Sequence, residues 1–141
     1  DLEGAGPGGD GGEQPGGAAG VQCRRLARGW RHAWSPDAQR VAYVDGGAIW
    51  VADPRGGAPQ QVAKVEGVVR WGPCWSPDGY HLAYEAAPDY GGTAAGFWVA
   101  RADGSRAWRV TELVTWGAKC WKKDGSALLF LSSQAAPVGE D

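Results

Sequence analysis

Residues 75–84 read Trp75-Ser76-Pro77-Asp78-Gly79-Tyr80-His81-Leu82-Ala83-Tyr84, a turn motif followed by a strand-like apolar run. The motif recurs upstream as Trp34-Ser35-Pro36-Asp37-Ala38 and downstream, in altered form, as Trp121-Lys122-Lys123-Asp124-Gly125. Proline presets φ at the second turn position, serine and aspartate side chains can bond back to the backbone, and the fourth position favours glycine. Each copy therefore predicts a tight turn that joins two antiparallel strands.

The three copies recur at a nearly constant spacing. Their tryptophans, Trp34, Trp75 and Trp121, lie 41 and then 46 residues apart, and this period is typical of four-stranded propeller blades. Short apolar runs between Gly-, Asp- and Pro-rich turns, without helical periodicity, favour an all-β fold. Nine Trp against two Phe and no Met indicate that each repeat uses Trp as its main packing residue.

The first full repeat divides into four strand-sized pieces. These are Trp30–Trp34, Gln39–Val44, Ala48–Ala52 and a last piece that ends at Val62. Asp45-Gly46-Gly47 is a hairpin signal between the second and third pieces. The repeat therefore predicts a four-stranded antiparallel sheet with strands in sequence order.

The second repeat follows the same plan with one enlarged connection. Trp71 stands where Trp30 stands in the first repeat, and Phe97–Ala100 matches Ile49–Ala52. The difference is the longer segment Ala86–Gly96 between the second and third strands. Long connections in a compact domain are often functional, which makes this segment a candidate for binding.

The two ends of the array are incomplete. The third repeat supplies only Val114–Trp121, the turn and Ala127–Leu131, while Val21–Ala27 resembles the runs that close the later repeats. The predicted fold class is therefore all-β: a partial β-propeller of four-stranded antiparallel blades. It has one trailing strand, two full blades and half of a third, preceded by a disordered Gly-rich segment.

Composition divides the chain into three parts. Residues 1–20 are rich in Gly, Pro and acids, and only Leu2 among them could anchor a core. Such a stretch cannot bury enough apolar surface to offset its chain entropy, which predicts a flexible linker. Residues 21–131 carry the blades, and residues 132–141 form a C-terminal tail.

Charge, hydropathy and cysteine content exclude several classes. A net charge of −2 gives no basic surface for nucleic acid. The sequence contains no apolar run of the roughly 18 residues that a membrane span needs, and no signal peptide pattern at its start. Cys23, Cys74 and Cys120 form no C-x-x-C pair, so they indicate neither a disulfide framework nor a zinc site.

The residues of the repeat resemble the TolB-type, WD-like β-propeller repeats of bacterial envelope and secreted proteins. The family hallmark is a Trp-Ser-Pro-Asp-Gly turn followed by an apolar strand, and the match extends from about Val21 to Leu131. It is strong at Trp75–Gly79, good at Trp34–Asp37, and weak at Trp121–Gly125, where two lysines replace Ser-Pro. The resemblance implies a periplasmic or secreted location.

The resemblance also implies a closed ring of six or more blades, which this chain cannot form alone. An open array would leave apolar surface and sheet edges exposed at both ends. We therefore expect the remaining blades in a longer parent chain or in associated copies of this one.

Catalytic chemistry is sparse in the sequence, which predicts no catalytic residue, metal site or cofactor. No Gly-x-Ser-x-Gly elbow occurs, and His32 and His81 form no metal-binding pair. We expect both histidines to be surface or packed strand residues. The repeated acids Asp37, Asp78 and Asp124 are expected to bond to the local backbone of their turns. The same structural role is predicted for the other motif residues: Trp34, Pro36, Trp75, Pro77, Gly79, Trp121 and Gly125.

Binding is expected on one rim of the array. In a four-stranded meander the second-to-third connection and the connection between blades open at the same end, which groups Ala86–Gly96 with Lys64–Arg70 and Glu112–Val114. A protein or peptide partner is the predicted ligand of this rim. The candidate partner-binding residues are Arg70, Trp71, Asp89, Tyr90 and Trp116. A solvated hairpin without a partner is the alternative.

Three functions remain open at this point. The first is a non-catalytic interaction or scaffold module of a bacterial envelope or secreted protein. The second is the accessory propeller of an enzyme that resembles the prolyl oligopeptidases, whose α/β-hydrolase domain would follow Asp141. The third is an enzyme with its site in the propeller, such as a polysaccharide lyase, which the two histidines disfavour.

Overall fold

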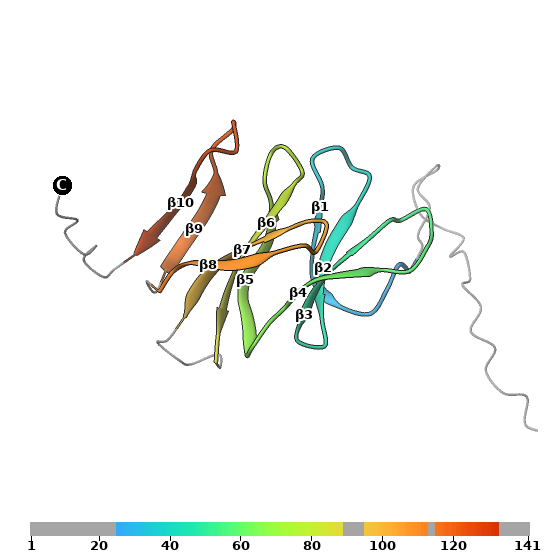
Figure 1. Cartoon of the computed structure of the whole chain (residues 1–141), viewed down its shortest axis with the longest axis horizontal. Helices are drawn as coiled ribbons and strands as arrows, with labels where there is room; N and C mark the ends of the chain where they lie inside the picture. The colour runs from blue at the N-terminus through green and yellow to red at the C-terminus, as the bar shows by residue number, and fades with distance from the viewer. Residues whose placement is uncertain (1–24, 89–94, 113–114, 133–141) are drawn as a thin grey trace, which may run out of the picture.

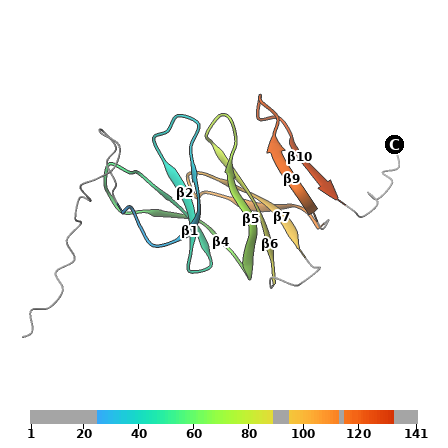
Figure 2. The same cartoon turned by 180° about the vertical axis from the view of Figure 1, so that it is seen from behind.

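The computed structural model describes residues 25–88, 95–112 and 115–132, with only the backbone described for 115–120 and for Ser132. Ten strands form three antiparallel sheets that lie side by side (Figures 1 and 2). The first sheet contains β1 (Trp30–Trp34), β2 (Val41–Asp45), β3 (Ala48–Ala52) and β4 (Gln60–Lys64). The second contains β5 (Val68–Trp75), β6 (His81–Ala87), β7 (Gly96–Arg101) and β8 (Ala107–Thr111). The third contains β9 (Thr115–Trp121) and β10 (Leu128–Ser132).

The strand order agrees with the prediction of two full blades and half of a third. Within each four-stranded sheet the strands follow sequence order, as in a meander. The first and third strands of the first sheet have the expected bounds, whereas β2 begins at Val41 instead of Gln39. The reason is that the turn extends to Arg40, whose carbonyl oxygen accepts a 2.8 Å hydrogen bond from the Ser35 backbone N–H.

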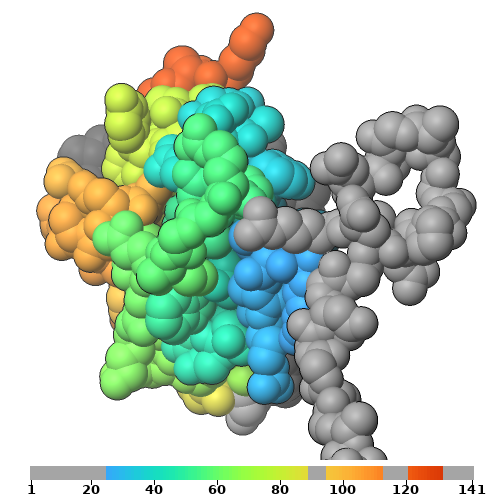
Figure 3. All heavy atoms as spheres, turned by 90° about the vertical axis from the view of Figure 1, so that its right-hand side faces the viewer, coloured from blue at the N-terminus to red at the C-terminus, as the bar shows by residue number. Residues whose placement is uncertain are grey.

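The predicted trailing strand does not form in the described part of its run. Arg25, Leu26 and Ala27 lie outside any strand, and residues 21–24 lie outside the described residues. Residues 25–29 instead lie along the face of the first sheet that is turned away from the second, seen at the front in Figure 3. At Gly29, with φ of +145°, an added Cβ would lie 2.6 Å from Cδ2 of Tyr43, so only glycine permits this close approach. The segments 1–20 and 133–141 lie outside the described residues.

The repeated turns have the predicted chemistry. In the second repeat, the Gly79 N–H donates to the Ser76 carbonyl oxygen at 2.9 Å, and Asp78 Oδ1 accepts from Ser76 Oγ and the Tyr80 N–H. Ser76 Oγ in turn accepts from the His81 N–H at 2.9 Å. The serine and aspartate thus satisfy the backbone of the turn, which explains why both residue types recur in the motif.

One turn residue departs from the motif at a cost. Ala38 has φ of +55°, where its counterparts Gly79 and Gly125 have +75° and +74°. A left-handed φ costs a non-glycine residue about 1–2 kcal/mol. Replacing alanine by glycine removes this cost, but it lowers stability by about 0.4–1 kcal/mol because the unfolded chain becomes freer. We therefore expect Ala38→Gly to raise the free energy of unfolding by about 0.5 kcal/mol, measured by urea denaturation. Gly79→Ala is the matched reverse change and should lower it; a loss of stability in Ala38→Gly would contradict this account.

Apolar side chains fill both spaces between the sheets. Leu82 and Tyr84 of β6 belong to the cluster shared with the first sheet, and Ala83 belongs to the cluster shared with the third. Successive residues of one strand are therefore buried on opposite faces, because both faces of the second sheet are covered. The second sheet is accordingly the only one of the three whose two faces are both packed against another sheet of the described chain.

Candidate functional site

The same hydrogen bond joins each pair of neighbouring sheets. The indole Nε1–H of Trp75 donates to the Ala33 carbonyl oxygen at 2.9 Å, and that of Trp121 donates to the Cys74 carbonyl oxygen at 3.2 Å. The two acceptors occupy equivalent positions: Ala33 directly precedes Trp34 in the first sheet, and Cys74 directly precedes Trp75 in the second. Trp75 and Trp121 therefore pack between neighbouring sheets, as predicted for the repeat tryptophans, and also fix how one blade sits on the next.

A second contact recurs beside this bond. The guanidinium of Arg40 lies 4.7 Å from the ring centroid of Trp75, and its Nη2 donates to the Gly79 carbonyl oxygen at 2.8 Å. His81 takes the place of Arg40 at the next interface, with its ring 6.5 Å from Trp121 and edge-on to Trp108 at 5.9 Å. His81 is thus packed between aromatic rings, and His32 is exposed on β1. Both positions agree with the expected structural roles.

The first sheet presents an unfinished copy of this interface. Trp34 occupies the position of Trp75 and Trp121, yet it is 55% exposed. Its indole N–H has no acceptor among the described residues. The hollow beside it is lined by the apolar side chains of Leu26, Trp30, Val41 and Tyr43, and also by those of Arg25, Arg28 and His32.

The third sheet presents the opposite half of the interface. Leu129 and Leu131 are 62% and 68% exposed. They stand eight and ten residues after the repeat tryptophan, as Ala42 and Val44 do in the first sheet, where both are fully buried against the second. The outer face of β10 is therefore a blade-stacking face without a neighbouring sheet in the described chain.

The turn aspartates have the electrostatics of structural residues. A hydrogen bond from Ser76 Oγ, with a second from the Tyr80 N–H, holds the pKa of Asp78 below its ordinary value. Ser35 and the Gln39 N–H act in the same way on the pKa of Asp37. A hydrogen bond from Ser126 Oγ likewise holds the pKa of Asp124 below its ordinary value. Among the described residues, no group of three or more His, Cys, Asp or Glu side chains could hold a metal ion.

The predicted partner-binding residues are only partly within the described chain. Arg70 and Trp71 lie in β5, and the Trp71 ring lies 5.7 Å from that of Phe97 in the cluster that faces the third sheet. Trp116 is described by its backbone alone, which pairs with Leu131. Asp89 and Tyr90 lie outside the described residues. The patch as a whole therefore stays a prediction.

The connection between the first two blades lies at one end of the array. The Val65 N–H donates to the Gly47 carbonyl oxygen of the β2–β3 turn at 2.8 Å, and Gly67 lies against Ala87 at the end of β6. At the opposite end, Arg40 bonds to the turn at Gly79. The turn at Gly79 thus lies at the opposite end of the array from the segment between β4 and β5 and from the end of β6. Among the described residues there is no helix long and apolar enough to cross a membrane.

Two comparisons with known proteins gave no match: no family model and no curated protein matches this chain. Among solved structures, the chain is similar to one described as "putative TolB from Agrobacterium tumefaciens", with a TM-score of 0.59 and 23% sequence identity. The match covers 84% of this chain and 43% of that chain, so this chain spans less than half of its length. The likeness shows the fold: an all-β, TolB-like part of a β-propeller, as the sequence predicted.

Proposed function

We propose that this chain is a non-catalytic interaction and scaffold module, part of a TolB-like β-propeller whose two end faces stack on further blades. The observation that carries the proposal is the contact made by the repeat tryptophan. It occurs at both interfaces of the array, and Trp34 holds the same position on the outer face of the first sheet, where the described chain places no neighbouring sheet. The further blades come from a parent chain or from associated copies.

The rim of the array is the proposed surface for a protein or peptide partner. The rim carries the connections that do not repeat, and Arg70, Trp71, Asp89, Tyr90 and Trp116 are its candidate contacts. Aromatic and arginine side chains are the types that dominate binding energy at protein interfaces. The likeness to TolB supports a bacterial envelope or secreted protein as the setting, with a periplasmic or secreted location.

The coding sequence on both sides of residues 1–141 tests the proposal directly. We expect further Trp-Ser-Pro-Asp-Gly-like motifs there, spaced as Trp34, Trp75 and Trp121 are. A Gly-x-Ser-x-Gly elbow in a downstream α/β-hydrolase domain would instead support the alternative, an accessory propeller of a prolyl-oligopeptidase-like serine hydrolase. Flanking sequence without any such repeat would contradict a propeller completed within one chain.

A further inference from the structure

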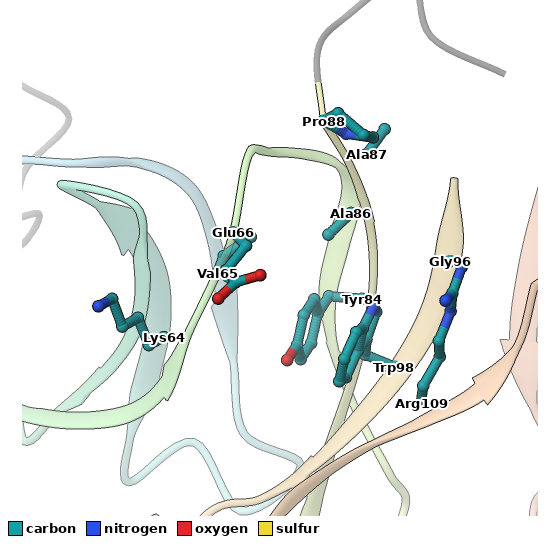
Figure 4. A pocket seen from close by; sticks show the side chains of 10 residues that line it. All are labelled: Lys64, Val65, Glu66, Tyr84, Ala86, Ala87, Pro88, Gly96, Trp98 and Arg109. Carbon is teal, nitrogen blue, oxygen red and sulfur yellow. The ribbon is translucent and has the colours of Figure 1, made fainter. Parts of the chain in front are cut away.

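A cleft of about 360 Å³ opens between the first two sheets at the rim (Figure 4). One wall is the segment Lys64–Glu66, where the chain leaves β4 for β5, and the other is the face of the second sheet. Sites for small ligands range from roughly 300 to 1,000 Å³. The cleft therefore has room for a ligand about as large as one amino acid.

The floor of the cleft is aromatic. Tyr84 and Trp98 are cross-strand neighbours with nearly parallel rings, their centroids 6.5 Å apart and their planes inclined by 9° (Figure 4); Tyr84 is almost fully buried, so the Trp98 ring supplies most of the aromatic surface. Burial raises the pKa of Tyr84 to about 12, so its hydroxyl group is neutral at physiological pH. Ala86, Ala87 and Pro88 continue the apolar surface toward the mouth. This floor suits an apolar or aromatic group of a ligand.

An indole N–H is available at this floor. In the first sheet, Trp50 Nε1–H donates to the Asp45 carbonyl oxygen at 3.1 Å. Trp98 stands at the same place in the second sheet, but its Nε1–H has no acceptor among the described residues. Every fully buried side-chain nitrogen or oxygen of the described chain has a hydrogen-bond partner. The Trp98 nitrogen has none in that part of the chain, so it is accessible to solvent. Trp98 thus offers a donor that its counterpart in the first sheet has already used.

A guanidinium group lies beside this donor because of a glycine. Arg109 of β8 pairs with Trp98 as Gln61 of β4 pairs with Trp50. A Cβ added at Gly96 would lie 2.6 Å from Arg109 Nε and 3.0 Å from Trp98 Nε1, so the missing side chain makes room for both nitrogens. Figure 4 shows Arg109 reaching toward Gly96 along this wall.

Arg109 is only weakly engaged by the protein itself. Its Nη1 lies 3.3 Å from Glu112 Oε1, and both side chains are more than a third exposed. Exposed ion pairs of this kind contribute little, so a ligand carboxylate could replace Glu112. Lys64 and Glu66 on the opposite wall balance each other in charge, which leaves Arg109 and Trp98 as the adjacent donors of the cleft.

We propose that this cleft binds an apolar carboxylate, with its carboxylate group on Arg109 and the Trp98 Nε1–H and its apolar group over the Trp98 ring. Two N–H donors side by side match the two oxygens of a carboxylate. The source is either a free small acid or the carboxyl-terminal residue of a peptide. The site is separate from the blade-stacking faces. It lies at the rim proposed above for a protein or peptide partner, and its binding of a free acid does not depend on that proposal.

The test uses the full chain and N-acetyl-phenylalanine, with N-acetyl-phenylalanine amide as the uncharged control. Binding is measured by equilibrium dialysis and by saturation-transfer NMR on the ligand. We expect the acid to bind and the amide to bind at least about tenfold more weakly, because the amide loses a charge-assisted pair of hydrogen bonds. A longer peptide that ends in phenylalanine, with a free or an amidated terminus, distinguishes the two sources: tighter binding of the free peptide than of the acid assigns the site to peptide ends.

Four variants separate the site from general charge effects. Arg109→Gln should weaken binding of the acid at least about tenfold, whereas Arg101→Gln, the same change at the far end of the second sheet, should leave it unchanged. Gly96→Ala keeps every charge but displaces Arg109, and should also weaken binding. Glu112→Gln should strengthen it, because Arg109 loses its competing carboxylate.

Two results would overturn the proposal. Equal binding of the acid and the amide would show that no carboxylate is recognised. Binding of the acid that survives both Arg109→Gln and Gly96→Ala would place the ligand elsewhere. Far-UV circular dichroism of the Gly96→Ala variant checks that a loss of binding comes from the site and not from unfolding; Ala48, at the corresponding position of the first sheet, shows that the blade accepts alanine there.

Discussion

Trp75→Ala is expected to lower the free energy of unfolding by about 3–5 kcal/mol, whereas Trp34→Ala should change it by no more than about 0.5 kcal/mol. The two residues occupy the same place in the same motif. Trp75 is buried between two sheets and donates to Ala33, while Trp34 is 55% exposed at the end of the array. The cost of removing the ring therefore depends on whether a neighbouring sheet covers it.

Urea denaturation followed by far-UV circular dichroism measures both changes, at protein concentrations low enough to keep the chain monomeric. Trp75→Phe is the intermediate variant: it keeps a ring in the interface but removes the Nε1–H, and should cost about 1–3 kcal/mol because the Ala33 carbonyl oxygen loses its donor. Equal losses for Trp34→Ala and Trp75→Ala would show that Trp34 itself is covered in the monomer, contrary to its exposure in the structure.

This contrast also marks what could be read from the sequence. The turns, the strand order and the all-β fold follow from local rules, since a Ser-Pro-Asp-Gly turn and a two-residue hairpin act over a few residues. The exposure of Trp34 follows from its place in the array, which no local pattern encodes. Likewise, Val21–Ala27 resembles a closing strand, but its described part, Arg25–Ala27, has no strand of its own sheet to pair with in the described chain.

The cleft could not be predicted from the sequence, because it depends on strand register. It depends on Trp98 lying opposite Arg109, and the register of β7 with β8 shifts between Phe97 and Trp98. A shift of this kind cannot be placed from residue spacing alone. The available signal was a difference between repeats: glycine in place of Ala48, and arginine in place of Gln61.

The two end faces of the array have complementary halves of one interface. The first sheet presents Trp34, whose indole N–H has no acceptor among the described residues. The third sheet presents Leu129 and Leu131, and the Cys120 carbonyl oxygen, which corresponds to the acceptors of Ala33 and Cys74. Such a pair of unlike faces joins copies head to tail, as in heterologous assemblies. Burying each leucine or tryptophan would contribute on the order of 1.5–3 kcal/mol from area alone.

Purified residues 1–141 are therefore expected to associate as the concentration rises and to bind a hydrophobic dye.

Leu131→Asp blocks one face and Trp34→Asp the other, so each variant alone should sediment as a monomer. Mixed together, they retain one intact face each and should form a one-to-one dimer, because the remaining faces are complementary. Tyr80→Asp is the matched control: Tyr80 is 71% exposed but lies at the turn end, so this change should leave association intact. Sedimentation velocity across a range of concentrations measures all four proteins. A monodisperse wild-type monomer with a sharp unfolding transition and no dye binding would show that these faces do not stack.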